Sequence, residues 1–525
     1  MKKSYAILLH SAAAILLGII LTFAFAPYEI FPLAILAPAG LLALWLKVAP
    51  SRGHAFRLGF LFGLGFFGSG VYWVFTSIHV FGGVPTALAL IITIGMISFL
   101  ALIPASVGYF LNRYFPAQTT AKLVFAFPAI WIMSEWVRSW IFTGFPWLLL
   151  GYSQTNSPLK GYAPILSVYG VSLALTMSSA LIVNAVYKYK RQAFKALYLN
   201  LLTLAIIWIL GGLFSLIPWT IPQDKPITVS LVQGNIPQSI KWSPEHLQLS
   251  LDRYTELTQP LWGKSNIIIW PEASVPLPLQ NAEDFINALD DKANESGSAL
   301  ILGIPIRTQD GKSYYNSVIT LGADKGVYSK RHLVPFGEYT PLESLLSNAL
   351  QFMNIPMSEM QAGDYRQAPL VIGKTKILAS VCYEIAFPDI TRSWDKSIGM
   401  LLVVTNDAWF GESNAEPQHL QMAAMRALEF GKPVLFVSND GITAIINPKG
   451  QIEASIPQRE ATVLNGKVQP MYGITPWLFN GMDPVLFIAL VFLFISVRAN
   501  KIATGAISDK PASKKSQQTK TLDPK

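Results

Sequence analysis

The chain has 525 residues, of which 52% are hydrophobic and only 14% are charged, and its mean hydropathy is +0.40. Because globular soluble proteins carry about 25% charged residues, this composition excludes a wholly soluble protein and places much of the chain in lipid. The formal net charge of +9 is uneven: residues 224–473 carry 20 Lys and Arg against 26 Asp and Glu, whereas the rest of the chain carries 20 against 5. The basic excess therefore belongs to the membrane part and its tails, and the acidic segment shows no basic face interleaved with aromatic residues that would indicate nucleic-acid binding.

Hydrophobic runs long enough to cross a bilayer, which takes about 20 helical residues, predict eight transmembrane helices. The first run, between Lys3 and Glu29, also resembles a signal peptide, but it is long for a signal core and further runs follow at once, so we expect an uncleaved helix. The last run, 484–497, is the shortest; we extend it by residues 477–479 and expect it to span the bilayer rather than to lie at its surface. The other six lie at 30–46, on either side of the GGVP turn (82–85) within 58–112, at 121–141, within 162–187 and within 196–218.

The charges of the connecting loops orient these helices, because loops rich in Lys and Arg stay on the cytoplasmic side. The loops near 26–29 and 80–86 hold no basic residue, whereas alternate loops and both ends of the chain are basic. This pattern predicts cytoplasmic termini in a bacterial inner membrane, with residues 224–473 on the outer, periplasmic side. The tail from 508 to 525, rich in Ser, Lys and Gln, is predicted to be disordered. The basic loops contain Lys47, Arg52 and Arg57, then Arg113 and Lys122, then Lys188, Lys190, Arg191 and Lys195.

The chain accordingly divides into four predicted parts: a seven-helix membrane domain (1–220), an extracytoplasmic domain (221–473), an eighth helix (474–499) and a basic cytoplasmic tail (500–525). In the extracytoplasmic domain, short apolar strands alternate with helical stretches, which predicts an α/β sandwich. We expect strands at 227–233, 266–270, 299–306, 315–321, 377–382, 400–406 and 434–439, a hairpin around 447–450, and helices at 244–259, 281–296 and 417–430.

Cys382 is the only cysteine of the chain, which excludes an internal disulfide. It lies in ILASVCYEIAFPD (377–389), a run typical of a buried strand that ends on a turn, and such strand ends often carry nucleophiles. A lone cysteine is, however, more often a small buried hydrophobic residue. Cys382 by itself therefore does not identify a catalytic site.

Two further stretches favour catalysis. Glu272 follows an apolar strand in IIIWPEAS, and Lys330 and Glu338 follow another in YSKRHLVPFGEY. A thiol needs a base to become the nucleophilic thiolate, and the oxyanion formed by its attack on a carbonyl needs a donor or a cation. Each of the three residues has a structural alternative, as a helix N-cap, a snorkelling surface lysine or a turn residue. All three together, beside the only cysteine, indicate a Glu–Lys–Cys site.

Several cofactor motifs are missing from the sequence. It has no phosphate-binding loop, no dinucleotide glycine pattern, no G-x-S-x-G elbow and no paired His or Cys ligands. We therefore predict neither a metal nor an organic cofactor.

Eight short motifs, taken in order, resemble those of the carbon-nitrogen hydrolase (nitrilase) superfamily and, with the flanking membrane helices, those of the apolipoprotein N-acyltransferase family. The resemblance covers nearly the whole chain apart from the tail and implies a nitrilase-like α-β-β-α sandwich. The motifs are GSGVYWV (68–74), FPWLLLGYSQ (145–154), QGNIPQSIKW (233–242), WPE (270–272), HLVPFGEYTPLE (332–343), CYE (382–384), NDAWFG (406–411) and NDGITA (439–444).

The resemblance implies the last step of lipoprotein maturation. An acyl chain would pass from a membrane phospholipid, phosphatidylethanolamine in particular, to Cys382 as a thioester, and then to the α-amino group of a diacylglyceryl-cysteine at the N-terminus of an apolipoprotein. In family terms, Glu272 would be the general base and Lys330 the residue that stabilises the oxyanion, and Glu338 would be an additional essential carboxylate. The resemblance also implies that Trp242, Tyr383, Glu384 and Trp409 line the substrate site.

Two other functions were weighed against this one. A membrane-tethered amidase or nitrilase acting on a small substrate would need a single anchor, so seven additional helices argue against it. A transporter with an outer binding domain would place ionisable residues along a path through the membrane. The predicted spans offer only Glu135 and Arg138, one helical turn apart and able to pair, near the end of a helix.

The segment 342–360 holds many apolar side chains for a connection between two strands. We hypothesise that it forms an amphipathic arm that dips into the outer leaflet and covers Cys382, since long loops in compact domains are usually functional and Met-rich surfaces adapt to irregular ligands. The alternative is that the segment packs on its own domain. Its apolar residues include Leu342, Leu345, Leu346, Leu350, Phe352, Met353, Ile355, Met357 and Met360.

Overall fold

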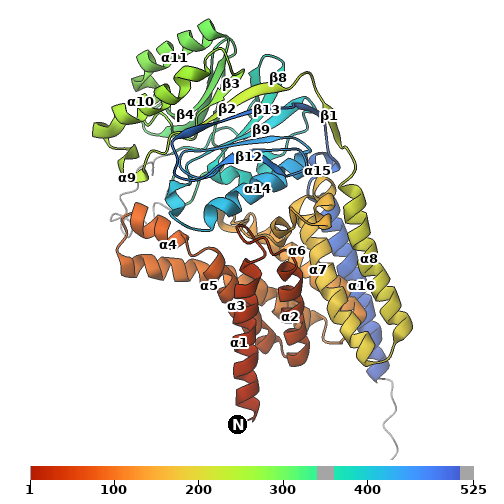
Figure 1. Ribbon diagram of the computed structural model, residues 1–525. Helices are drawn as coiled ribbons and strands as arrows, with labels where there is room; N and C mark the ends of the chain where they lie inside the picture. Colours follow the sequence, from red (N-terminus) through yellow and green to blue (C-terminus); the bar gives the residue numbers. More distant parts are fainter. Residues whose placement is uncertain (1, 340–359, 509–525) are drawn as a thin grey trace, which may run out of the picture.

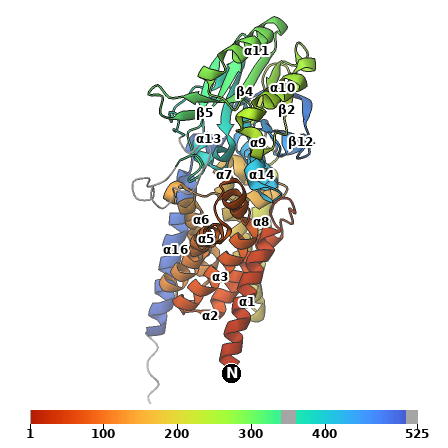
Figure 2. The same cartoon turned by 90° about the vertical axis from the view of Figure 1, so that its left-hand side faces the viewer.

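A computed structural model describes residues 2–339 and 360–508 of the chain (Figure 1). A bundle of helices forms one end of the molecule and an α/β domain forms the other (Figure 1). The start of α1 (Lys2–Thr22) and the end of α16 (Asp483–Ser508) lie at the same end of the bundle, away from the α/β domain (Figure 2). This arrangement confirms the predicted fold class. The hypothesised arm lies outside the described residues, apart from Met360.

The helices that could cross a membrane can be compared with the predicted eight. Within the described residues, five helices are long and apolar enough to cross a membrane, and a sixth span results if the pair Arg52–Gly70 and Val74–Phe81, bent by 61°, is counted as one. The other two predicted spans correspond to α2 (Leu33–Val48), with 16 residues, and to η2 (Lys122–Ala126) followed by α6 (Phe127–Arg138). The total of eight therefore stays a prediction. The five long helices are Tyr5–Thr22, Thr86–Tyr114, Pro158–Lys190, Phe194–Phe214 and Asp483–Gly505.

The last long helix begins and ends later in the chain than the predicted segment 474–499. Residues 477–479, which we had added to it, belong to a separate short helix, α15 (Pro476–Asn480), because Gly481 with a φ of 61° ends that helix. Helix α16 then runs from Asp483 to Ser508. The predicted boundary at residue 499 thus lies inside the helix, and the first residues assigned to the tail are helical.

Small residues allow the membrane helices to approach closely. Gly63 of α3 (Arg52–Gly70) lies so near α5 (Thr86–Tyr114) that a Cβ atom on it would come within 2.6 Å of the Cα of Ala101. Between helices in lipid there is no hydrophobic driving force, so close backbone contact of this kind is a main source of association. A larger residue at position 63 would push α3 and α5 apart.

The α/β domain is built on two six-stranded sheets. The first has the order β13-β2-β3-β4-β5-β6 and the second β12-β11-β10-β9-β8-β7. In strand order, the first sheet comprises Thr462–Val468, Ile227–Gln233, Ile267–Ile269, Ala299–Arg307, Tyr314–Leu321 and Gly326–Ser329. The second comprises Ile452–Ile456, Thr443–Ile446, Val434–Ser438, Ile398–Thr405, Thr375–Val381 and Leu370–Ile372. All seven predicted strands and the predicted hairpin are present, whereas β6, β7, β13 and the small β1–β14 pair (Thr220–Pro222 with Met471–Gly473) were not predicted.

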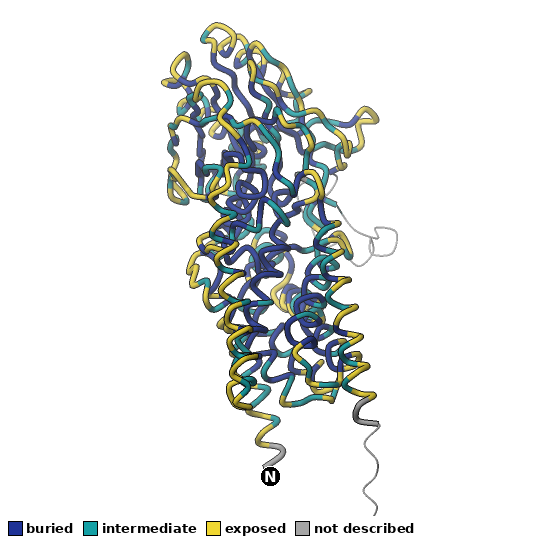
Figure 3. Tube along the Cα trace, turned by 90° about the vertical axis from the view of Figure 1, so that its right-hand side faces the viewer, coloured by how far each residue is buried: buried dark blue, intermediate teal, exposed yellow. Residues whose placement is uncertain are grey.

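Alternate side chains of the first sheet enter two different cores. In β3, Ile267 and Ile269 face the second sheet, whereas Ile268 and Trp270 pack against the covering helices α10 (Leu247–Thr258) and α11 (Glu283–Ser296). Because both faces are buried, such strands read as continuous apolar runs. The core between the sheets is continuous with that of the membrane helices, so a buried interior runs through the whole molecule (Figure 3).

Helix α14 (Ala415–Phe430) covers the other face of the second sheet and lies against the membrane domain (Figure 1). Its Glu429 reaches α7 (Ala163–Lys190) at a break in that helix, where Ser167 has a φ of 61°. Glu429 accepts hydrogen bonds from Ser167 Oγ (2.6 Å) and from the backbone N–H of Val168 (2.8 Å), and it pairs with Arg426 (2.6 Å). A carboxylate of the α/β domain thus caps a membrane helix, which fixes the two domains together.

Candidate active site

Cys382 lies where β8 ends, as predicted. The strand stops at Val381, and Cys382 begins the short 3₁₀ turn η9 (Cys382–Ala386) with a φ of 52°. A left-handed backbone is strained for any residue with a Cβ atom, and such strain is often found at functional sites. The side chain is 8% exposed. The Cys382 thiol is therefore nearly enclosed, on a sharp turn.

Glu272 and Lys330 come from the first sheet and meet at the same place. Glu272 follows β3 and Lys330 follows β6, and Lys330 Nζ is 3.8 Å from Glu272 Oε1. The carboxylate of Glu272 also accepts hydrogen bonds from Asn316 Nδ2 (2.7 Å) and from the backbone N–H of Asn406 (2.9 Å). Both side chains interact electrostatically with Cys382. The fold thus brings together the three residues that the sequence placed at strand ends.

Glu338 is the second carboxylate of the site. Its Oε1 lies 2.9 Å from Lys330 Nζ and accepts a hydrogen bond from Asn316 Nδ2 (3.0 Å), while its Oε2 accepts one from the backbone N–H of Val334 (2.8 Å). Asn316 therefore bridges Glu338 and Glu272. Lys330 is held between two carboxylates and is almost completely buried.

Burial and charge set the protonation of these groups. Burial raises the pKa of the Cys382 thiol well above its ordinary value, and the charge of Glu272 adds to this rise. Burial also raises the pKa of Glu272, which the charge of Lys330 opposes. Burial lowers the pKa of Lys330, but the carboxylates of Glu338 and Glu272 outweigh it and hold that pKa above its ordinary value. The resting site therefore contains a protonated thiol and a charged ammonium beside a carboxylate of raised pKa, which suits that carboxylate to accept a proton.

Glu384 is buried behind the nucleophile and has both oxygens occupied. Oε1 accepts hydrogen bonds from the backbone N–H groups of Arg331 (2.6 Å) and His332 (3.1 Å). Oε2 accepts hydrogen bonds from the backbone N–H of Val381 (2.8 Å) and from the hydroxyl of Tyr328 (2.9 Å). This carboxylate connects the end of β8 to the loop that follows Lys330, and both of its oxygens are bonded to protein groups.

The three predicted site-lining aromatic residues lie on different elements. The hydroxyl of Tyr383 donates to the carbonyl of Gly144 in the membrane domain (3.0 Å). Trp409, in η10 (Asp407–Phe410), accepts a hydrogen bond at its carbonyl from Ser77 Oγ (2.7 Å). Trp242 is half-buried at the end of α9 (Gln238–Lys241). Two of the three are thus attached directly to the membrane domain.

Several residues around the site were not predicted. Lys241 is buried, and its Nζ donates to the backbone carbonyl of Glu272 (3.0 Å); burial lowers its pKa to about 8, against the charge of Glu272. Asn316 is a polar residue within an apolar strand, a signal that could have revealed it. His419 and Asp407 form a buried pair behind Cys382. His419 does not stand out in the sequence, whereas Asp407 lies in the motif NDAWFG (406–411), in which no role was assigned to it.

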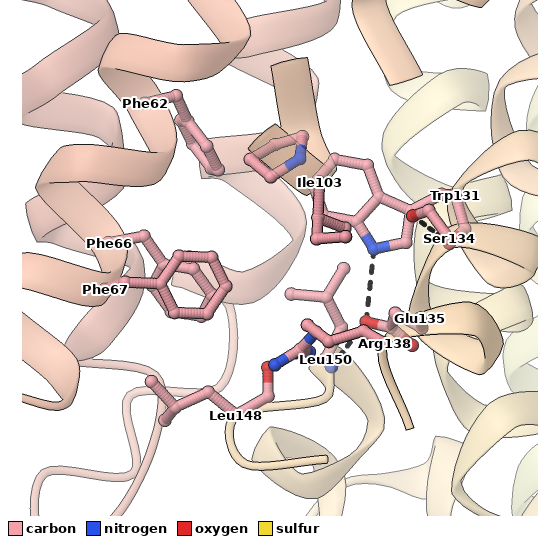
Figure 4. Close-up of a pocket in the computed structure, with 11 residues that line it drawn as sticks. Phe62, Phe66, Phe67, Ile103, Trp131, Ser134, Glu135, Arg138, Leu148 and Leu150 are labelled. Carbon is pink, nitrogen blue, oxygen red and sulfur yellow. Dashed lines mark hydrogen bonds between the residues drawn. The ribbon is translucent and has the colours of Figure 1, made fainter. Parts of the chain in front are cut away.

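A small cavity of about 20 Å³, partly open to the outside, lies in the membrane domain between α3, α5 and α6 (Figure 4). Its walls are mostly apolar, with Glu135 and Arg138 at one side. Arg138 donates to the backbone carbonyls of Phe145 and Trp147 rather than to Glu135, which accepts hydrogen bonds from Trp131 Nε1 (3.1 Å) and the backbone N–H of Leu150. These two side chains, which we expected to be able to pair, instead fasten the loop after α6. The lining residues are Phe62, Phe66, Phe67, Ile103, Pro104, Trp131, Ser134, Glu135, Arg138, Leu148 and Leu150.

Metal binding has no support in residues 2–339 and 360–508. Within these ranges, no group of three or more His, Cys, Asp and Glu side chains is arranged to hold a metal ion.

Comparison with known proteins matches each domain of the chain to a described family. Residues 17–181 match the apolipoprotein N-acyltransferase N-terminal domain, and residues 228–474 match carbon-nitrogen hydrolase. The apolipoprotein N-acyltransferase of Coxiella burnetii is 41% identical over 489 residues, which are 93% of this chain and 100% of that protein. That of Photobacterium profundum is 38% identical over 521 residues, 97% of this chain and 98% of that protein. A solved carbon-nitrogen hydrolase superfamily protein from Xanthomonas campestris is 21% identical, covers 47% of this chain and 91% of that one, and has a TM-score of 0.37.

Proposed function

This chain belongs to the apolipoprotein N-acyltransferase family, and from that premise we propose that Cys382 carries the acyl group as a thioester between donor and acceptor. As a member of the family it is a bacterial membrane enzyme that N-acylates lipoproteins. The single observation that carries the proposal is the meeting of Glu272, Lys330 and Cys382, from three separate strand ends, in one enclosed site.

In the first half-reaction, the thiol attacks the ester carbonyl of a phospholipid. Glu272 takes the proton from Sγ as the S–C bond forms, and the ammonium of Lys330 stabilises the negative charge that develops on the carbonyl oxygen. When the intermediate collapses, the ester C–O bond breaks and Glu272 returns the proton to the departing lysophospholipid oxygen. The products are the thioester on Cys382 and a lysophospholipid, and the base ends as it began.

In the second half-reaction, the neutral α-amino group of a diacylglyceryl-cysteine attacks the thioester. Glu272 accepts a proton from the attacking nitrogen while Lys330 again stabilises the oxyanion. The C–S bond then breaks, and the proton passes from Glu272 to the released thiolate. An amine attacks a thioester more readily than water does in a nearly enclosed site, so acyl transfer exceeds hydrolysis.

The remaining residues support these steps. Glu338 holds the ammonium of Lys330 at 2.9 Å, so it acts as an orienting carboxylate. Glu384 acts by position, because four protein donors occupy its oxygens. Trp242, Tyr383 and Trp409 are the proposed walls of the substrate site. The proposed donor is phosphatidylethanolamine.

The proposed topology places the α/β domain on the periplasmic side of the inner membrane and both termini in the cytoplasm. It is supported by the basic loops and by the position of the two ends of the described chain on the side away from that domain (Figure 2). A phosphatase fused after residue 300 should be active outside the cytoplasm, whereas one fused at the C-terminus should be inactive. Activity of the C-terminal fusion would overturn this topology, the proposed division into domains 1–220, 221–473 and 474–499, and the assignment of α16 as a span.

The experiment that tests the thioester is mass spectrometry of the purified protein after incubation with phosphatidylethanolamine vesicles. We expect an acyl adduct on the peptide that contains Cys382, its loss on addition of a diacylated lipopeptide, and no adduct in Cys382→Ser. Transfer without any adduct on Cys382 would contradict the mechanism. An amidase acting on a small soluble substrate is the remaining alternative; it predicts hydrolysis of short amides, which this assay measures in parallel.

A further inference from the structure

A buried histidine and aspartate lie directly behind the nucleophile and have no part in the steps above. His419, in α14, and Asp407, in η10, are both 0% exposed, and His419 Nδ1 is 3.0 Å from Asp407 Oδ1. His419 Nε2 is 3.1 Å from the backbone carbonyl oxygen of Cys382. The pair therefore contacts the main chain of the nucleophile itself.

The hydrogen bonds form a closed circuit on Cys382. Its carbonyl contacts His419, His419 contacts Asp407, and Asp407 Oδ1 accepts a hydrogen bond from Thr405 Oγ1 (2.7 Å). Thr405 in turn interacts with the thiol of Cys382. These contacts link the carbonyl of Cys382 to its side chain through three buried residues.

The atom of Cys382 that His419 contacts determines which of the two residues donates the hydrogen bond. A carbonyl oxygen can only accept, so Nε2 of His419 carries a hydrogen and donates it. Asp407 Oδ1 lies at Nδ1, so the ring orientation that places Nδ1 at Asp407 also places Nε2 at the carbonyl of Cys382. Asp407 thus holds the His419 ring in the orientation that directs Nε2 toward Cys382.

Aromatic rings prevent the imidazole from turning. Trp147, from the membrane domain, lies nearly parallel to His419 with the ring centres 5.7 Å apart, and its Nε1 donates to the neighbouring Gln418 (2.6 Å). Phe436 and Phe410 meet the ring edge-on. The donor is therefore fixed by contacts from both domains.

We propose that His419 is a positioning residue that, oriented by Asp407, holds Cys382 in its left-handed conformation and so aims the thiol at the acyl carbonyl. The backbone of Cys382 has a φ of 52°, a conformation that persists only where surrounding contacts impose it. The bond from His419 to its carbonyl is such a contact. The inference rests on the proposed role of Cys382 as nucleophile.

Two matched substitutions separate the two ends of the imidazole. The amide nitrogen of glutamine reaches the position of Nε2, so His419→Gln keeps a donor for the carbonyl of Cys382. The amide of asparagine reaches only the position of Nδ1, so His419→Asn keeps contact with Asp407 and loses the bond to Cys382. If the hydrogen bond to the carbonyl of Cys382 positions the thiol, His419→Gln should retain activity and His419→Asn should lose it.

The measurement is the rate of acyl-adduct formation on Cys382 in the full-length protein, with phosphatidylethanolamine vesicles at varied concentration. At saturating donor we expect His419→Asn to be about 100-fold slower than the wild type, since a displacement near 1 Å has effects of that size, and His419→Gln to lie within about tenfold. The donor concentration at half-maximal rate should stay unchanged in both, because positioning of the thiol affects the chemical step. Equal rates in the two variants, or a faster rate in His419→Asn, would overturn the proposal.

Controls separate this result from a loss of folding and from a failure of the thioester mechanism. Met425→Ala removes a buried side chain from the same helix, but Met425 makes no contact in the circuit around Cys382. This variant should lower the melting temperature about as much as His419→Asn does. It should not show the 100-fold loss of rate that is expected for a misplaced thiol. A loss of rate in Met425→Ala as large as in His419→Asn would show that only the packing of α14 matters, against the proposal. If the wild type forms no adduct on Cys382, both the proposed function and this inference fail; if the wild type forms the adduct and the two His419 variants behave alike, only the inference fails.

Discussion

The two sheets of the α/β domain are alike in size but differ in what covers their outer faces. The first sheet is covered by α10 and α11, which enclose a small core of their own. The second is covered by α14, whose other side lies on the membrane helices, and its core is continuous with theirs (Figure 3). Glu272 and Lys330, the proposed base and oxyanion-stabilising cation, come from the first sheet, and Cys382, the proposed nucleophile, comes from the second. The proposed acid–base groups thus lie on the self-contained half of the domain, and the proposed nucleophile lies on the half that is fixed to the membrane domain.

Removing the base tests the contribution of the first sheet alone. Glu272→Gln keeps the shape of the side chain but cannot accept the thiol proton, so we expect acyl-adduct formation to fall by about 10³-fold, in the range that general base catalysis contributes. The thiol should still react with a small alkylating reagent, because the second sheet is untouched. Adduct formation at the wild-type rate would remove Glu272 from the role of base.

Glu384→Gln tests the support of the nucleophile in the second sheet. The amide NH₂ would face backbone N–H groups that now donate to a carboxylate, so the end of β8 and the loop after Lys330 should move apart. We expect adduct formation to fall by about 100-fold. Glu412→Gln, an exposed carboxylate with 83% of its side chain accessible, serves as the control and should behave as wild type. A normal rate in Glu384→Gln would show that the four hydrogen bonds are dispensable.

The second sheet is attached to the membrane domain through α14, so we expect a large loss of stability when a contact of this attachment is removed. Glu429→Ala leaves the guanidinium of Arg426 buried without its partner and uncaps the break in α7, so we expect it to destabilise the protein by about 3–5 kcal/mol. Thermal unfolding in detergent measures this. The double variant Glu429→Leu with Arg426→Met, which removes both charges, should recover much of the loss. A melting temperature for Glu429→Ala equal to that of the wild type would contradict a structural link at this point.

The first sheet should respond locally to loss of its own core. Leu289→Ala in α11 removes a buried side chain from the small core, at a cost of about 2–5 kcal/mol. Since that core is separate, hydrogen exchange should speed up in α10 and α11 and stay slow in α14. If hydrogen exchange increased equally in α14, the two sheets and their covering helices would unfold as one unit, and their cores would not be separate.

The smallest expected effect is a shift in pH dependence. Burial raises the pKa of the Cys382 thiol, and the negative charges of Glu272 and Asp407 raise this pKa further. The positive charge of Lys330 lowers the pKa of the thiol. Lys241 also lies close enough to interact with the thiol. Asp407→Asn removes one of the raising charges, so the pKa of the thiol falls and the midpoint of alkylation by a small reagent moves to lower pH. Alkylation by mass spectrometry across a pH series measures it. A shift to higher pH would show that Asp407 acts mainly by orienting a charged His419.

Part of the candidate site could be located from the sequence because the signal is local. Glu272 and Cys382 each follow an apolar strand that was predicted, whereas Lys330 follows the short strand β6 (GVYS), which was not. His419 could not be predicted in this way, since its bond to Cys382 joins residues 37 positions apart and depends on how α14 lies on β8 and β9. Asn316 could have been singled out as a polar residue within an apolar strand, but its two carboxylate partners come from different loops and could not be predicted from the strand.

The fold differed from expectation where polar contacts override apolar runs. The predicted span 121–141 ends at Arg138, because that side chain turns to the carbonyls of Phe145 and Trp147 and draws the chain into a loop. Strand β13, with the sequence TVLNGKV, was missed because polar residues interrupt its apolar pattern; it is held instead by its register with β2. In both cases the deciding partners are distant in the sequence.

Helix α14 is buried on every side, with Pro417 as its only residue outside the buried class. Its polar side chains Gln418, Gln421 and Glu429 bond to Trp147, Ala26 and Val168 of the membrane domain. During synthesis the ribosome completes α1 to Phe214, the end of the last membrane-domain helix before the sheets, ahead of α14, and domains fold in the order in which they are made. In the proposed topology the inserted bundle is thus present as a template when α14 reaches the periplasmic side, and we expect residues 221–473 produced without the membrane helices to fail to fold.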